Sequence, residues 1–190
     1  MTSFRVTVTD DKSSALSALP FTFAYLQQPL NPYTFTAPKT RAWVEAQCAG
    51  KDVLNLFAGP TRLEGCRETT NDLNLEFNTD FQMDALRCVR LFCEGHLDFD
   101  VILLDPPYSY RKSMELYQGH KNSRFKKTLD VLPTILRPNG IVITFGHHSI
   151  VMGKKRGFAL REICLISPGG AQHDTIVTVE ERITVTEVTA

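Results

Sequence analysis

Residues 99–104 constrain the fold of this chain most strongly, because they form a nearly continuous apolar run that ends in Asp105-Pro106-Pro107-Tyr108. An apolar run on both faces is typical of a central strand in a parallel sheet that helices cover on both sides. The two prolines fix φ and remove two backbone donors, so the turn is stiff and presents carbonyl oxygens. Because open α/β sheets bind ligands at the carboxyl ends of their strands, we expect a ligand site at this turn.

The remaining pattern predicts further strands and helices that alternate along the chain. We expect helices at 39–48 (with Pro38 in the first turn), 85–95 and 123–136. We expect strands at 52–57, 68–73, 99–104, 141–145, 158–166 and 175–183, and candidate strands at 4–9, 21–25 and 78–84. Parallel strands with helical crossovers and a C-terminal antiparallel hairpin predict an α/β fold with a doubly wound, mostly parallel sheet. Residues 31–190 read as one domain, and residues 1–30 as an N-terminal extension of unassigned role.

Composition limits the possible partners and compartments. Lys plus Arg equals Asp plus Glu at 21 each, so any nucleic-acid surface must be a local patch. The five cysteines form no CxxC pair, and we expect reduced thiols in a cytoplasmic protein. Cys88, Cys93 and His96 could be imagined as metal ligands, but their apolar neighbours favour a buried helix face, so no metal is expected. No apolar run reaches membrane-spanning length, and no membrane partner is expected.

A second strand-to-loop signal lies upstream, where Asp52-Val53-Leu54 leads into Asn55-Leu56-Phe57-Ala58-Gly59. Gly59 lets the backbone approach a ligand closely. In this order, the glycine loop and the Asp-Pro-Pro-Tyr turn resemble class I S-adenosylmethionine-dependent methyltransferases. Among these, the chain is similar to the nucleic-acid amino methyltransferases, over roughly residues 30 to 185. The resemblance implies the Rossmann-like methyltransferase fold and S-adenosyl-L-methionine as cofactor.

The resemblance also implies a role for each cofactor residue. The loop from Asn55 to Gly59 would wrap the amino-acid half of the cofactor, Asp72 would accept the ribose hydroxyls, and Asp84 with Ala85 would read the adenine. Aromatic residues just before the first of these strands would lie near the methionine end, where a ring face stabilises a sulfonium. The expected cofactor-binding residues are Tyr33, Phe35, Asn55, Phe57, Ala58, Gly59, Asp72, Asp84 and Ala85.

Several of these residues have a second interpretation. Asn71 or Asn74 could take the ribose role of Asp72, and Asp84 could instead cap the following helix. Tyr33 and Phe35 could simply pack in the core. The chain also departs from the family pattern, because Pro60 follows the first glycine and the interval to Asp72 is short. We therefore expect the first crossover helix to be very short or missing.

The expected catalytic residues are Asp105, Pro106, Pro107 and Tyr108. The Asp105 carboxylate and the Pro106 carbonyl would each accept an N–H of an exocyclic amine, and Tyr108 would stack on the attached ring. Beyond them, Tyr110, Arg111 and Lys112 begin a basic, aromatic loop that suits phosphates and stacked bases, or is a solvated loop. The pairs and runs His147-His148 and Lys154-Lys155-Arg156 are expected at or just past the same sheet edge.

These residues predict methyl transfer to an exocyclic amino group of a nucleobase, first of all adenine N6 in DNA. The alternatives are an RNA methyltransferase acting on guanine N2 or adenine N6, glutamine methylation of a protein, or a subunit that binds the cofactor without catalysis. The interval between Gly59 and Asp105 is too short for a target-recognition domain. Nucleic acid is therefore the expected partner, and a separate target-recognition subunit is a further one to consider.

Overall fold

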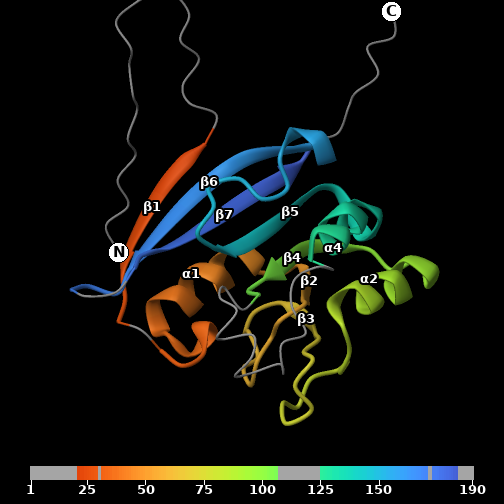
Figure 1. Cartoon of the computed structure of the whole chain (residues 1–190), viewed down its shortest axis with the longest axis horizontal. Helices are drawn as coiled ribbons and strands as arrows, with labels where there is room; N and C mark the ends of the chain where they lie inside the picture. The colour runs from red at the N-terminus through yellow and green to blue at the C-terminus, as the bar shows by residue number, and fades with distance from the viewer. Residues whose placement is uncertain (1–20, 30, 107–124, 171–172, 184–190) are drawn as a thin grey trace, which may run out of the picture.

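The computed structural model describes residues 21–29, 31–106, 125–170 and 173–183, and within them a seven-stranded sheet has the order β1-β6-β7-β5-β4-β2-β3 (Figure 1). The strands are β1 (Thr22–Gln27), β2 (Asp52–Asn55), β3 (Arg67–Thr70), β4 (Phe99–Leu104), β5 (Leu136–Gly146), β6 (Phe158–Ser167) and β7 (Thr175–Arg182). The helices are α1 (Pro38–Cys48), α2 (Ala85–Glu94) and α4 (Phe125–Val131), with 3-10 turns η1 (Thr34–Thr36), η2 (Leu132–Ile135) and η3 (Lys154–Arg156).

Most neighbouring strands are parallel. β2 pairs in parallel with β3 and β4, β4 pairs in parallel with β5, and β1 pairs in parallel with β6. β7 lies between β5 and β6 and is antiparallel to both, which confirms the predicted C-terminal hairpin. β1 comes from the segment that was given no role, and it extends the sheet beyond β6. The α/β architecture with a mostly parallel sheet is therefore confirmed.

Helices cover the two faces of the sheet, with α1 on one side and α2 and α4 on the other (Figure 1). Alternate residues of the central strand divide between two cores. Val101 packs in the core that contains Trp43 of α1, and Ile102 packs in the core that contains Phe92 of α2. Burying one such side chain stabilises the fold by roughly 1.5–3 kcal/mol, so the apolar run at 99–104 holds the two layers together.

Two segments differ from the predicted elements. β5 begins at Leu136, earlier than expected, because Phe99 lies opposite Leu136 and Val101 opposite Ile141. Asn139, whose φ is 61°, lies in the resulting irregularity inside the strand. Residues 78–84 form no strand, and only Phe81 makes a bridge to Asn71.

The predicted helix at 123–136 is α4 followed by η2, where Pro133 lacks the N–H that would continue an α-helix. No helix in the described ranges is both long and apolar enough to cross a membrane. All five cysteines lie in described segments and none forms a disulfide. Burial raises the pKa values of the Cys48, Cys88 and Cys164 thiols to about 12.

Candidate functional site

The candidate site lies at the carboxyl ends of β2 and β4, where the strand order reverses. From β2 the chain passes to β3 on one side, and β4 lies on the other side of β2. The loops that leave β2 and β4 therefore diverge, and open α/β sheets bind ligands in the crevice outside the strand ends at such a point. The glycine loop follows β2, and Asp105 follows β4.

Asp105 leaves the sheet at the same level as the glycine loop. Asn55 lies opposite Leu103 in the parallel pairing, and the Leu56 backbone N–H donates to the Leu103 carbonyl at 3.2 Å. Asp105 is partly buried and Pro106 is buried. On the other side of β4, Leu104 lies opposite Thr144, so the end of β5 flanks the same edge. The other half of the motif, Pro107 and Tyr108, and the loop residues Tyr110, Arg111 and Lys112 lie outside the described residues, as does the candidate strand at 4–9.

The glycine loop is fixed by a buried carboxylate. Gly59 has a φ of 61°, and its backbone N–H donates to Oδ2 of Asp72 at 2.9 Å. The other carboxylate oxygen, Oδ1, accepts the backbone N–H of Asn74 at 2.9 Å. Asp72 is only 1% exposed, so both bonds are sheltered from water. Asp72 therefore fixes the conformation of the loop, in addition to any contact with a ligand.

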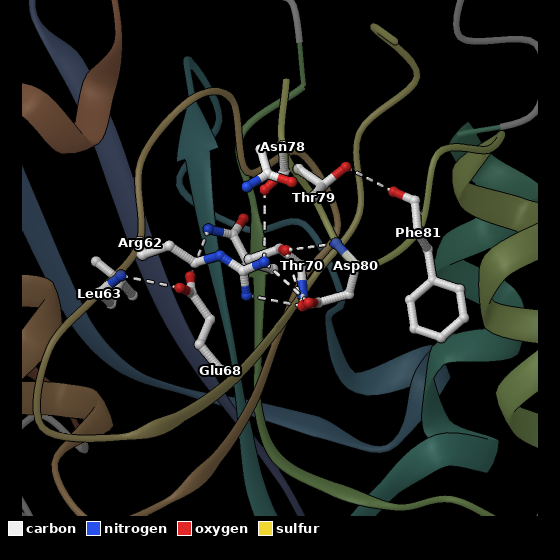
Figure 2. Close-up of polar contacts among 9 residues, drawn as sticks. Arg62, Leu63, Glu68, Thr70, Asn78, Thr79, Asp80 and Phe81 are labelled. Atoms are coloured by element: carbon white, nitrogen blue, oxygen red, sulfur yellow. Dashed lines mark hydrogen bonds and ion pairs between the residues drawn. The ribbon is translucent and has the colours of Figure 1, made fainter. Parts of the chain in front are cut away.

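Residues 56–66 connect β2 to β3 without a helix, as the short interval predicted. Side chains hold this connection in place of helical hydrogen bonds (Figure 2). Arg62 binds Asp80 with two bonds of 2.8 Å, and Oδ2 of Asp80 also accepts the N–H of Thr70 at 2.8 Å and its hydroxyl at 2.9 Å. The hydrogen bond from Arg62 lowers the pKa of Asp80 to about 2, with help from the bonds of Thr70. Charge-assisted pairs of this bidentate kind are stronger than neutral hydrogen bonds.

A second carboxylate completes this connection. Oε2 of Glu68 accepts the backbone N–H of Leu63 at 2.8 Å (Figure 2). Its Oε1 accepts the Asn55 amide at 3.0 Å. Asn55 is fully buried, so its side chain belongs to this internal contact, and any cofactor contact at this position falls to its backbone. Sequence reasoning missed Arg62, Glu68 and Asp80 as a group. The signal available was the missing helix, which required other groups to fix the loop.

The alternative ribose ligands are already used by the fold. The Asn71 amide donates to the carbonyls of Leu56 and Met83 at 3.2 and 3.1 Å, and its Oδ1 accepts the N–H of Met83. Oδ1 of Asn74 accepts the backbone N–H of Glu76 at 3.0 Å. Asp72 is engaged in the same way, by two backbone N–H groups, so its ribose role stays a prediction.

The two expected aromatic residues lie in different environments. Tyr33 is 40% exposed, and a Cβ added at Gly59 would lie 3.7 Å from its ring, so this ring borders the glycine loop. It also meets Phe77 edge-to-face at 5.7 Å between ring centroids. Phe35 is 2% exposed and packs edge-to-face on Phe145 at 5.5 Å, inside the core. Of the pair, Tyr33 is the ring that a ligand could reach.

Asp84 caps α2, as its second interpretation predicted. Its carboxylate accepts the backbone N–H of Arg87 at 3.2 Å, and Ala85 is the first residue of the helix.

Phe57 and Ala58 belong to the glycine loop after β2. The Phe57 ring packs on Phe125 at 6.3 Å between ring centroids, and Ala58 is buried. No cluster of three or more His, Cys, Asp or Glu side chains suited to a metal ion occurs in the described part of the chain.

One of the predictions for this edge of the sheet, the position of Lys154–Arg156, is wrong. His147 and His148 follow β5 at the carboxyl edge as expected, and both are exposed. Lys154–Arg156 instead precede β6, whose first residue Phe158 pairs with Arg182 at the end of antiparallel β7, so this cluster lies at the opposite edge. Arg156 is also engaged there with Asp130 at 2.7 Å.

The chain that connects these two edges is fixed by Glu180 of β7. Its carboxylate is 1% exposed and accepts the backbone N–H groups of Val151, Met152 and Gly153 at 2.9, 2.8 and 2.8 Å. Three backbone donors therefore solvate a buried charge that has no ion pair in the described residues. This holds the crossover from β5 to β6 against the sheet.

Comparison with solved structures identifies the architecture. TrmN from Thermus thermophilus superposes with a TM-score of 0.54 at 20% identity, over 77% of this chain and 49% of that one. The N-methyltransferase NodS from Bradyrhizobium japonicum superposes with a TM-score of 0.54 at 11% identity, over 82% and 100%. The chain has the Rossmann-like methyltransferase fold. A further neighbour, 1,6-didemethyltoxoflavin-N1-methyltransferase from Burkholderia thailandensis with bound S-adenosylhomocysteine, superposes with a TM-score of 0.51 at 14% identity, over 76% of each chain.

These neighbours establish the fold, and two further structures with the same fold are described as putative methyltransferases, one as S-adenosylmethionine-dependent and one in complex with S-adenosylhomocysteine. The chain spans about half the length of TrmN and of two other methyltransferases that it matches, 49%, 48% and 48%. No protein-family model and no curated protein sequence matches the chain.

Proposed function

We propose that this protein transfers a methyl group from S-adenosylmethionine to an exocyclic amino group of a nucleobase, with adenine N6 in DNA as the first substrate and an RNA base as the second. The observation that carries the proposal is the position of Asp105 and Pro106. They end a central strand at the switch point of a methyltransferase fold, beside the loop that follows β2. A carboxylate and a proline carbonyl at that point are acceptors suited to an amine.

The residues around the glycine loop fit the cofactor. Gly59 adopts a positive φ that favours glycine, and the exposed Tyr33 ring beside it would contact the sulfonium through its π face. Asp72 uses one lone pair of each oxygen for a backbone N–H, and a carboxylate has further lone pairs for the ribose hydroxyls. Asp84 at the start of α2 would accept the adenine amino group. When bound, the cofactor supplies an electrophilic methyl group.

The protein's own contribution is to hold the amine. An exocyclic amino lone pair is delocalised into the base and is a weak nucleophile. Hydrogen bonds from its two N–H groups to the Asp105 carboxylate and the Pro106 carbonyl would localise that lone pair and direct it at the methyl group. Asp105 would also stabilise the positive charge that develops on the nitrogen. Orientation and electrostatics then supply most of the rate, and no covalent enzyme intermediate is needed.

A target base in a duplex must leave the stack before its amino group can enter this crevice. Tyr108 would stack on the base after it has left the duplex, as the sequence predicts. A single-stranded or already unpaired base would need less energy to reach the same position. The choice between DNA and RNA is therefore tested with both kinds of polynucleotide, each as single strand and duplex.

The test is identification of the product. The protein is incubated with methyl-labelled S-adenosylmethionine and, separately, with unmodified DNA, RNA, and a denatured protein mixture, and the labelled nucleosides are identified after complete digestion. The proposal expects label in N6-methyl-2′-deoxyadenosine from DNA, or in an N-methylated adenosine or guanosine from RNA. Cofactor binding by calorimetry without label in any polynucleotide would overturn it, and label in protein alone would assign a different substrate.

A further inference from the structure

A surface pocket of about 380 Å³ lies between α2 and α4, and its described lining is mostly cationic. Arg87 and Arg90 are three residues apart on α2 and share one helix face, and Lys127 reaches the pocket from α4. Asp84 and Leu86 complete the described lining. All three cations are exposed.

Five other arginines of the described fold, Arg41, Arg62, Arg67, Arg137 and Arg156, each form an ion pair with a carboxylate. Arg161 and Arg182, on β6 and β7, form none with a described carboxylate, but they lie apart from the pocket. None of the described carboxylates forms an ion pair with the three cations of the pocket. In a chain with a net charge of zero, the pocket is therefore a local surplus of positive charge suited to an anion.

The cofactor does not supply that anion. Its single carboxylate belongs to the methionine half, which the proposed function assigns to the glycine loop. The adenosyl half, assigned to Asp84, carries no negative group. The three cations around Asp84 therefore have no partner in the cofactor, and the anion must come from the second substrate.

We propose that the pocket between α2 and α4 binds backbone phosphates of a polynucleotide substrate through Arg87, Arg90 and Lys127. This inference rests on the proposed function and specifies how its substrate is held. The pocket lies beside the candidate site, because α2 begins at Asp84 and Phe125 at the start of α4 packs on Phe57 of the glycine loop. A strand whose phosphates contact these cations would thus run past the crevice that receives its base.

The experiment measures polynucleotide affinity by fluorescence anisotropy. The probes are a short labelled single-stranded RNA, the single-stranded DNA of the same sequence, and the matching DNA duplex, each titrated at several salt concentrations. Each phosphate contact with a single strand contributes a slope of about 0.7 in log affinity against log salt. Arg87→Ala, Arg90→Ala and Lys127→Ala should each reduce that slope by about 0.7 and weaken binding about fivefold near 0.1 M salt.

Control variants separate this site from general charge loss. Arg161→Ala removes an exposed arginine from β6, in the half of the sheet away from α2, and should bind the probes like the wild type. Arg87→Lys keeps the charge and should retain most of the affinity. Calorimetry with S-adenosylmethionine should give the same Kd for all variants, because their contacts are with the polynucleotide.

Equal probe affinity and equal salt slope in the wild type and in the three alanine variants would overturn the inference, even if the protein methylates nucleic acid. A loss of cofactor affinity without loss of probe affinity would also overturn it and would assign the cations to the cofactor. Probe binding that depends on the three cations, in a protein that methylates no polynucleotide, would support the inference while the proposed function failed.

Discussion

Asp72→Ala should destabilise the whole domain as well as the cofactor site. The substitution removes a carboxylate that accepts two backbone N–H groups, those of Gly59 and Asn74, both at 2.9 Å. A hydrogen bond to a charged group contributes about 1.5–3 kcal/mol, so the two together contribute about 3–6 kcal/mol. Since domains are stable by about 5–15 kcal/mol, this is a large fraction of the total.

For a domain of this size, that loss lowers the melting temperature by about 6–24 °C. Asp72→Asn keeps one carbonyl acceptor and should lose about half as much. Asp72→Ala removes both bonds and releases the loop around Gly59, so cofactor affinity should fall at least tenfold in this variant. Urea denaturation gives the free energy of unfolding, and calorimetry gives the Kd of S-adenosylmethionine.

Asp98→Ala is the matched control, because Asp98 is an exposed aspartate just before β4, at the edge of the sheet away from the site. It should unfold and bind cofactor like the wild type. An Asp72→Ala protein with wild-type stability would show that the buried carboxylate does not hold the loop. The argument from its two backbone bonds would then be refuted.

Three further variants test the groups that fix the loops. Glu180→Gln should lower the free energy of unfolding by about 1–3 kcal/mol in urea, because one of its oxygens becomes an amide that faces backbone N–H donors, and wild-type stability would contradict this. Gly59→Ala should cost about 1–2 kcal/mol, because its φ of 61° is left-handed while its Cβ has room, and an unchanged melting temperature would refute the strain. Asp80 has a pKa lowered to about 2 in the folded state, so its contribution is complete above about pH 4 and is lost as the pH falls toward 2. In Asp80→Asn, the free energy of unfolding should therefore depend less on pH below about pH 4. The same pH dependence as in the wild type would contradict the role given to Asp80.

The central strand was predictable from its own residues. The run at 99–104 is apolar on both faces, so only a strand covered by two layers buries it, and β4 has the predicted bounds. The helix at 38–48 was equally well specified, by Pro38 at its start and Gly50 after its end. Local sequence rules decide such elements.

Elements that depend on distant partners were not predictable in the same way. β1 confirms the candidate strand at 21–25, but its pairing with β6, which follows it by more than a hundred residues in the chain, could not be predicted. The connection between β2 and β3 was expected to lack a helix, but Arg62 and Asp80 come together only through the fold. Lys154–Arg156 were assigned to the wrong edge because the direction of the β5–β6 crossover cannot be read from composition.

In the candidate site too, some features follow from local sequence and others only from the fold. Asp105 and the glycine loop could be assigned to one edge because each directly follows a predicted strand. The structural role of Asp72 could not be predicted, since a carboxylate after a strand suits a ribose and a backbone N–H equally well. The cationic pocket was also not foreseen, because Arg87 and Lys127 lie on separate helices that meet only in the folded chain.

Single-turnover methyl transfer by Asp105 variants tests the central claim most directly. The wild type, Asp105→Ala and Asp105→Asn are compared at saturating cofactor on the polynucleotide that accepts label, with Asp98→Ala as the control at the other end of β4. Removing an acceptor of developing charge costs a factor of about 10² to 10³ in rate, so Asp105→Ala should be slower by that factor and Asp105→Asn should fall between it and the wild type. Cofactor affinity should be unchanged in both. Methyl transfer at the wild-type rate by Asp105→Ala would contradict the account, and the end of β4 would then be only the structural end of a strand.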